Sequence, residues 1–172
     1  MKALFYRYRN ICEVEISEAF HDIGIDFIEL VAGNDALSEL SRLKETIDDV
    51  LPDFVFSIDF FPLVSDVCNI YHIRYISWIV DCPVMELYFK QISNNWNRVF
   101  IFDKMQYEEV KVYNPEKIFY FPLAAGINSK KRLFERTDYN KQNLYAHDIA
   151  FVGSLYTEIS HYDDVNGLKS YD

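Results

Sequence analysis

The sequence has little glycine, and its glycines are not grouped into phosphate-binding motifs. Only 5 of the 172 residues are glycine. The first predicted strand runs into Tyr8-Arg9-Asn10-Ile11, without a G-x-G-x-x-G fingerprint, so we expect no dinucleotide cradle there. The chain also lacks a P-loop, a G-x-S-x-G nucleophile elbow and any spacing typical of metal ligands. These absences exclude the enzyme classes that depend on such motifs.

Cysteine is scarce as well. Cys12, Cys68 and Cys82 are widely spaced and odd in number, whereas disulfide frameworks and zinc sites need paired or closer cysteines. We therefore expect free thiols in a reducing cytoplasm, with neither a metal ion nor another cofactor.

Long apolar runs and an excess of basic charge are missing too. No stretch is long and apolar enough to be a transmembrane helix, and the N-terminus lacks the pattern of a signal peptide. The 17 Lys and Arg residues face 27 Asp and Glu residues, a net charge of −10. Because nucleic-acid binding needs basic surfaces, we expect no nucleic-acid partner, while local binding of a small anion stays open.

What the sequence does have is an alternation of predicted strands and helices. Strands are predicted over 2–8, 26–31, 54–58, 73–80, 99–102 and 118–121. Helices are predicted from Asn10 to Gly24, from Asp35 to Pro52, from Pro62 to Tyr71, over 84–92 and over 104–113. This order is typical of βαβ units. It predicts an α/β fold with a doubly wound, mainly parallel Rossmann-like sheet of six to seven strands.

Three segments of different character follow one another along the chain. Residues 1–127 hold the predicted sheet, and residues 128–147 are polar and charged, as in a connector. Residues 148–172 contain a seventh predicted strand, 149–152, and a polar tail. The seventh strand either joins the main sheet or begins a second domain.

The most informative stretch is the buried strand 75–80, which ends in Asp81-Cys82-Pro83. Ligands of open α/β sheets bind beyond the carboxyl ends of the strands. The candidates for lining a cleft at that edge are Arg9, Asn10, Asp59, Asp81, Ala125 and Gly126. A separate candidate for a phosphate site is Gly153-Ser154, where the seventh strand meets a small-residue turn.

Each acid at a strand end has two interpretations. Asp59, Asp81 and Asp103 either cap the following helix or turn, or face the cleft as ligand-binding groups or bases. Asp103 is the clearest cap. We interpret Cys82 as a small buried residue, because no histidine lies near it in the sequence. The acids of the first helix, Glu13 among them, are expected largely on faces away from the core.

Three segments together carry a family resemblance. Trp78-Ile79-Val80-Asp81-Cys82-Pro83, Phe121-Pro122-Leu123-Ala124-Ala125 and Ile149-Ala150-Phe151-Val152-Gly153-Ser154-Leu155-Tyr156 occur in this order. In this the chain resembles the spore-maturation-protein-like glycosyltransferases of bacteria, which carry an N-terminal domain of unknown function. The likeness covers most of residues 1–156. It departs from the family at Cys82, where a second acid or a small polar residue is expected.

The resemblance implies a GT-B architecture, in which two Rossmann-like domains face each other across a cleft. The N-terminal domain would hold the sugar or other acceptor, and a C-terminal domain would bind the nucleotide-sugar donor without a metal ion. On this reading Gly153 to Tyr156 begins a donor domain that is missing from this chain, and no catalytic residue is assigned. The chain alone is expected to be inactive.

Two alternatives stay open. The chain could be a stand-alone flavodoxin-like module that binds a small ligand without catalysis. It could also be a protein-interaction module, because its 13 Tyr and 14 Phe residues are enough to form an exposed aromatic patch.

Overall fold

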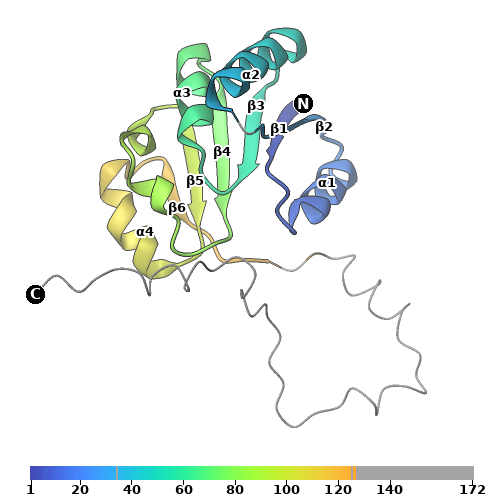
Figure 1. Ribbon diagram of the computed structural model, residues 1–172. Coiled ribbons are helices and arrows are strands. Elements are labelled where there is room, and N and C mark those ends of the chain that lie inside the picture. The colour runs from blue at the N-terminus through green and yellow to red at the C-terminus, as the bar shows by residue number, and fades with distance from the viewer. Residues whose placement is uncertain (34, 125, 127–172) are drawn as a thin grey trace, which may run out of the picture. The chain divides into compact units, whose positions relative to one another are not determined.

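The computed structural model describes residues 1–33, 35–124 and 126, which form one α/β domain (Figure 1). The strands are β1 (Lys2–Arg7), β2 (Asp26–Val31), β3 (Phe54–Ile58), β4 (Arg74–Ile79), β5 (Asn97–Ile101) and β6 (Ile118–Tyr120). The helices are α1 (Glu13–Asp22), α2 (Ala36–Val50), α3 (Pro62–Tyr71) and α4 (Lys104–Val110), with 3₁₀ turns η1 (Met85–Tyr88), η2 (Lys90–Ser93) and η3 (Lys111–Tyr113).

All six strands are parallel, in the order β2-β1-β3-β4-β5-β6. The predicted α/β, doubly wound, Rossmann-like fold is therefore confirmed. From β1 the chain first adds a strand on one side and then builds outward on the other, so the winding reverses between β1 and β3. Such a reversal leaves a crevice at the carboxyl edge of the sheet, where ligands bind in this class of fold.

Local sequence signals placed several helix ends correctly. Gly24 follows α1 with a φ of 71°, as a glycine after a helix does. The side chains of Asp35 and Asp103 accept hydrogen bonds from backbone N–H groups in the first turns of α2 and α4. Pro62 lies in the first turn of α3, where its missing N–H is not needed.

The two faces of the sheet are covered differently. Helices α2, α3 and α4 cover one face and pack on Leu4, Val55, Tyr75 and Ile101. On the other face α1 covers β1, β2 and β3 through edge-to-face contacts among phenylalanines such as Phe5 and Phe20. Within the described residues no helix packs on β5 and β6 there, and their aromatic side chains remain partly exposed.

Apolar side chains near helix ends are more exposed than their spacing predicts. Leu37, Ile70 and the C-cap residues Ile23 and Leu51 are all between 65% and 78% exposed. Each lies at or next to the end of its helix, where the sheet no longer provides a packing surface. The core contacts of α2 come instead from its middle, where Leu43 and Ile47 are buried.

The single helix predicted over 84–92 is wrong, since this segment forms η1 and η2, separated by an extended residue, Phe89. The buried anchors are Leu87 and Ile92. Residues five apart lie on different faces of an α-helix. Two short turns let both side chains reach the core.

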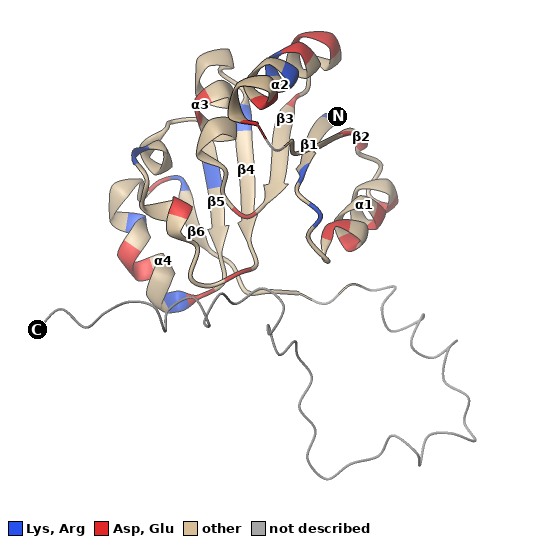
Figure 2. Cartoon of the chain, in the orientation of Figure 1, with Lys and Arg blue, Asp and Glu red and all other residues tan. Residues whose placement is uncertain are grey.

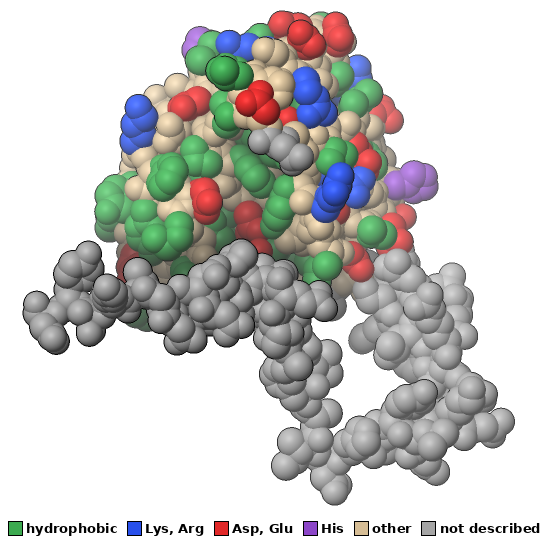
Figure 3. Space-filling model, viewed as in Figure 1, with side chains coloured by type: hydrophobic (Ala, Val, Ile, Leu, Met, Phe, Trp, Pro, Cys, Tyr) green, Lys and Arg blue, Asp and Glu red, His purple; other side chains and the backbone are tan. Residues whose placement is uncertain are grey.

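The connector 128–147, the seventh strand and the tail lie outside the described residues, so their predictions stay untested. In the described part of the chain, no helix is long and apolar enough to cross a membrane. Charged side chains of both signs are mixed with hydrophobic ones on the face seen in Figure 3.

Candidate functional site

The carboxyl ends of β1, β3 and β4 surround a cavity of about 370 Å³ at one edge of the sheet. The labelled arrows of β3 and β4 in Figure 1 point toward this edge. The cavity is lined by Tyr8, Asp59, Phe60, Phe61, Asp81, Pro83, Val84 and Glu86. Three aromatic rings and three carboxyl groups thus come together from three strand ends and the start of η1.

Asp59 is the best-fixed residue of the cavity. Its φ of 53° is left-handed, a conformation that residues other than glycine rarely adopt. Its carbonyl accepts hydrogen bonds from the hydroxyls of Ser57 at 2.7 Å and Ser77 at 2.9 Å, with Tyr75 at 3.4 Å. All three donors are fully buried, so a buried hydroxyl network holds the strained corner in place.

The carboxylate of Asp59 accepts hydrogen bonds from uncharged donors. Its Oδ1 accepts hydrogen bonds from the backbone N–H groups of Val80 at 3.0 Å and Asp81 at 3.3 Å. Its Oδ2 accepts a short hydrogen bond from the Tyr8 hydroxyl, which also accepts one from the Asn10 amide at 2.7 Å. Burial and the hydrogen bond to Asp59 both raise the pKa of Tyr8, so the phenol stays a donor.

Asp81 is more exposed than Asp59 and shares its environment. Partial burial, the negative charge of Asp59 and a hydrogen bond to that carboxyl all raise the pKa of Asp81. The charge of Asp59 thus disfavours ionisation of Asp81. Both carboxyl groups can accept hydrogen bonds from ligand hydroxyls, and Asp81 can act as a proton acceptor.

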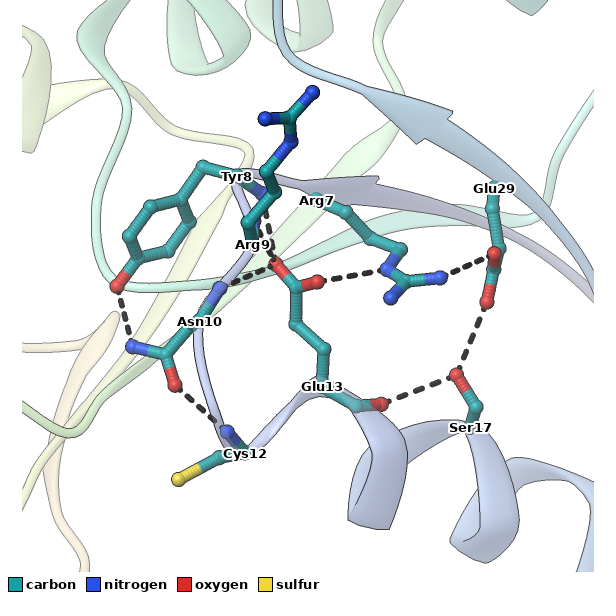
Figure 4. Close-up of polar contacts among 8 residues, drawn as sticks. All are labelled: Arg7, Tyr8, Arg9, Asn10, Cys12, Glu13, Ser17 and Glu29. Carbon is teal, nitrogen blue, oxygen red and sulfur yellow. Dashed lines mark hydrogen bonds and ion pairs between the residues drawn. The ribbon is translucent and has the colours of Figure 1, made fainter.

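The turn between β1 and α1 is closed by the protein itself (Figure 4). Glu13 is 1% exposed. Its Oε1 accepts hydrogen bonds from the backbone N–H groups of Tyr8 at 2.8 Å, Arg9 at 2.8 Å and Asn10 at 3.1 Å. This is the arrangement in which other α/β folds hold a phosphate. Here a carboxylate of the chain occupies it.

Arg7 anchors the other side of Glu13. Its Nε donates to Glu13 Oε2 at 2.8 Å, and its Nη1 forms a short ion pair with Glu29. Burial alone would raise the pKa of Glu13, but the hydrogen bonds from Arg7 and the backbone lower it below its ordinary value. Figure 2 shows the basic end of β1 beside the acidic α1.

The turn between β2 and α2 repeats this design. Glu39 is 3% exposed and accepts hydrogen bonds from the Gly33 N–H at 2.7 Å and from Arg42 at 2.9 Å. A Cβ atom on Gly33 would lie 2.7 Å from the Glu39 carboxylate, so any side chain there would displace that carboxylate. The first two strand ends therefore offer no vacant anion site.

Some of the predicted site residues line or support the cavity, some are described but lie away from it, and some lie outside the described residues. Asp59 and Asp81 line the cavity, and Asn10 supports it through Tyr8. Arg9 is exposed, with a φ of 73°, and its side chain extends away from the hydrogen bond between Tyr8 and Asn10 (Figure 4). Gly126 is described but does not line the cavity. Ala125, Gly153 and Ser154 lie outside the described residues.

Two sequence interpretations near the site are corrected. Cys82 is exposed rather than buried, because it follows the last residues of β4 at the open rim. The slight desolvation of the thiol and the charges of Asp103 and Glu109 raise the pKa of Cys82 even at this exposed position, which disfavours a nucleophilic thiolate. Glu13, expected on an outer face of α1, is buried because it satisfies the β1–α1 turn.

Sequence reasoning missed Tyr8, Phe61 and Glu86 as cavity residues, whereas Phe60 was expected at this edge beside Asp59. A signal for Glu13 was present, since Asn10-x-x-Glu13 matches a capping box, in which the acid reaches back to the backbone N–H three residues earlier. Asn10 itself accepts from the Cys12 N–H at 2.9 Å, although α1 begins later and its N-cap is Cys12.

The described residues contain no cluster of three or more His, Cys, Asp or Glu side chains suited to hold a metal ion. No protein-family model matches the chain, and no curated protein is similar to it.

Proposed function

We propose that the cavity at the carboxyl edge binds a hydroxyl-rich small molecule such as a sugar. The observation that carries this proposal is the grouping of Asp59 and Asp81 with the partly exposed rings of Tyr8 and Phe61 in the lining of one cavity. Carboxylate oxygens accept hydrogen bonds from hydroxyls, and aromatic faces pack against the apolar faces of sugar rings. A volume of about 370 Å³ is in the range of small-molecule sites.

Together with the sequence resemblance, this site supports a role as the acceptor-binding domain of a GT-B glycosyltransferase. The raised pKa of Asp81 suits a base that accepts the proton of an acceptor hydroxyl. Glu13 and Glu39 fill the first two strand-end turns, so a nucleotide-sugar donor would bind in a separate C-terminal domain. The described domain alone would hold the acceptor without transferring a sugar.

A stand-alone binding module is the second candidate, and the strand order favours it. The order β2-β1-β3-β4-β5 is that of flavodoxin-like folds. A flavin phosphate at the β1–α1 turn would compete with the Glu13 carboxylate for the same N–H groups. As a stand-alone module the chain would therefore bind a sugar in the cavity and transfer nothing.

We also propose a cytoplasmic location and no nucleic-acid partner. Cys12, Cys68 and Cys82 are free thiols, which suits a reducing compartment. The net charge of −10 disfavours contact with phosphate backbones.

Equilibrium binding of monosaccharides and disaccharides to the 172-residue chain tests the proposal. We expect Asp59→Asn and Asp81→Asn each to weaken sugar binding by about tenfold or more, because each removes a charged acceptor. Asp59→Asn keeps one oxygen for the N–H groups of Val80 and Asp81, so the corner is preserved.

Asp49→Asn is the matched control. Asp49 is an exposed residue of α2, so its substitution removes one negative charge far from the cavity and leaves sugar binding unchanged. Tighter binding of flavin mononucleotide or a nucleotide than of any sugar would contradict the proposal. So would sugar binding that neither cavity variant weakens.

A further inference from the structure

The cavity combines acids and aromatic rings without a basic side chain. Its lining contains three carboxyl groups, those of Asp59, Asp81 and Glu86, and no Lys, Arg or His. The aromatic rings of Tyr8 and Phe61 contact each other edge to face, with centroids 5.3 Å apart. A cavity lined in this way repels anions and attracts cations.

Three other acids of the domain that lie in turns or helices have cationic partners. Glu13 pairs with Arg7, Glu39 with Arg42 and Glu108 with Lys111. Asp59, in contrast, is 8% exposed and takes its hydrogen bonds from neutral donors, namely a phenol and two backbone N–H groups. Within the described residues, the acids of the cavity therefore face one another without a compensating cation.

A ligand with a positive charge would supply that compensation. An ammonium group offers three N–H donors, and charge-assisted hydrogen bonds to carboxylates are stronger than neutral ones. The partly exposed rings of Tyr8 and Phe61 add a cation–π attraction. Phosphates and carboxylates would meet like charge instead.

We propose that the ligand of this cavity carries a protonated amine beside its hydroxyls, as an amino sugar does. The inference rests on the proposed sugar-binding function and narrows its substrate class. Asp81 and Glu86 lie at the open side of the cavity and are exposed, so they would receive the ammonium group. The more buried Asp59 would receive hydroxyls.

Binding of an amine is expected to release a proton from Asp81. The titratable groups around Asp81 are Tyr8 and Cys12 from the β1–α1 turn, Asp59 from the end of β3 and Glu86 from η1. The pKa values of Tyr8 and Cys12 are raised, so both stay neutral near neutral pH. A bound cation favours ionised Asp81, so amine binding releases a proton and strengthens as pH rises through the raised pKa of Asp81.

Isothermal titration of the 172-residue chain with matched sugar pairs tests the inference. The probes are glucosamine, galactosamine and mannosamine against glucose, galactose and mannose, with N-acetylglucosamine as the uncharged amide. We expect at least one amino sugar to bind about tenfold more tightly than its neutral partner. Added salt, N-acetylation, Asp81→Asn and Glu86→Gln should each reduce that gain, whereas Asp49→Asn should keep it.

The outcomes distinguish this inference from the proposed function. If neutral sugars bind with Asp59-dependent affinity and the amine adds nothing, the amine inference is wrong and the sugar proposal stands. If no sugar of either kind binds, both are wrong. An amine gain that Asp81→Asn and Glu86→Gln leave intact would place the amine elsewhere and also overturn the inference.

Discussion

The turn after β1 and the corner after β3 lie at the same edge of the sheet and treat a carboxylate in opposite ways. At the turn, Glu13 is enclosed by three backbone N–H groups and Arg7, and these contacts lower its pKa. At the corner, Asp59 and Asp81 lie side by side in the lining of an open cavity, and partial burial and the charge of Asp59 raise the pKa of Asp81.

The difference separates a structural acid from a candidate binding acid. Glu13 satisfies every donor around it, so the turn has no capacity left for a ligand. The carboxyl oxygens of Asp59 and Asp81 can accept further hydrogen bonds from a ligand. A ligand that donates them would also reduce the repulsion between the two acids. This difference is why we propose ligand binding at the corner after β3 and not at the turn after β1.

Removing Glu13 should have the largest effect on stability. Glu13→Ala removes the acceptor of three backbone N–H groups and one of the two carboxylate partners of Arg7, so we expect a loss of about 2–4 kcal/mol in the free energy of unfolding. Urea denaturation measures it. Asp22→Ala, at the exposed end of the same helix, is the control and should change stability by less than about 0.5 kcal/mol. A similar loss in both variants would contradict the enclosed role of Glu13.

The second-largest effect on stability should come from the hydroxyls of Ser57, Tyr75 and Ser77 that bond the Asp59 carbonyl. Tyr75→Phe removes a fully buried hydroxyl that bonds Ser57 at 2.6 Å and the Phe61 N–H at 2.9 Å. We expect a loss of about 1–3 kcal/mol in urea denaturation, together with weaker sugar binding because the corner loosens.

Tyr71→Phe is the matched control for this effect. The Tyr71 hydroxyl donates to Asp48 on the exposed surface at 3.2 Å, so its removal should change stability by less than about 0.5 kcal/mol and leave sugar binding intact. Unchanged sugar binding in Tyr75→Phe would show that the network does not position Asp59.

The pH dependence of the two regions should have opposite signs. The raised pKa of Asp81 means that its contribution to stability is present in acid and is lost as pH rises through that pKa. Asp81→Asn mimics the protonated acid, so it should melt at a higher temperature than the wild type at neutral pH and at the same temperature in acid. Thermal melts across pH measure this difference.

Glu13 provides the reference, since its pKa is lowered. Its contribution is present above the ordinary glutamate pKa and is lost as pH falls through the lowered value. The destabilisation caused by Glu13→Ala should therefore shrink in acid. A pH-independent difference for either variant would remove the contrast between the two regions.

The smallest expected effect is chemical rescue of the turn. In Glu13→Ala the N–H groups of Tyr8, Arg9 and Asn10 would lose their acceptor, and an added carboxylate could replace it. We expect acetate to raise the melting temperature of Glu13→Ala slightly and to leave that of the wild type unchanged. An equal shift in both proteins would indicate a general salt effect.

Local signals accounted for the elements and most of their ends. Asp35, Asp103 and Gly24 act where their residue types predict, because caps and left-handed turns depend on a few neighbouring residues. The site was harder to predict. Asp59 and Asp81 followed from the rule that parallel strands end at one edge, but the Tyr8 hydroxyl reaches Asp59 across 51 residues of sequence. Such a contact depends on strand order and register, which local patterns do not specify.

Amide NMR spectra of the 15N-labelled chain during titration with an amino sugar test the central claim most directly. The amides of Val80 and Asp81 donate to Asp59 at the open corner, whereas the amide of Gly33 donates to Glu39 at a closed turn. The account predicts saturable shifts of the Val80 and Asp81 resonances, with that of Gly33 unmoved. Saturable shifts at Gly33 with Val80 and Asp81 unmoved, or no saturable shift at either place, would contradict it.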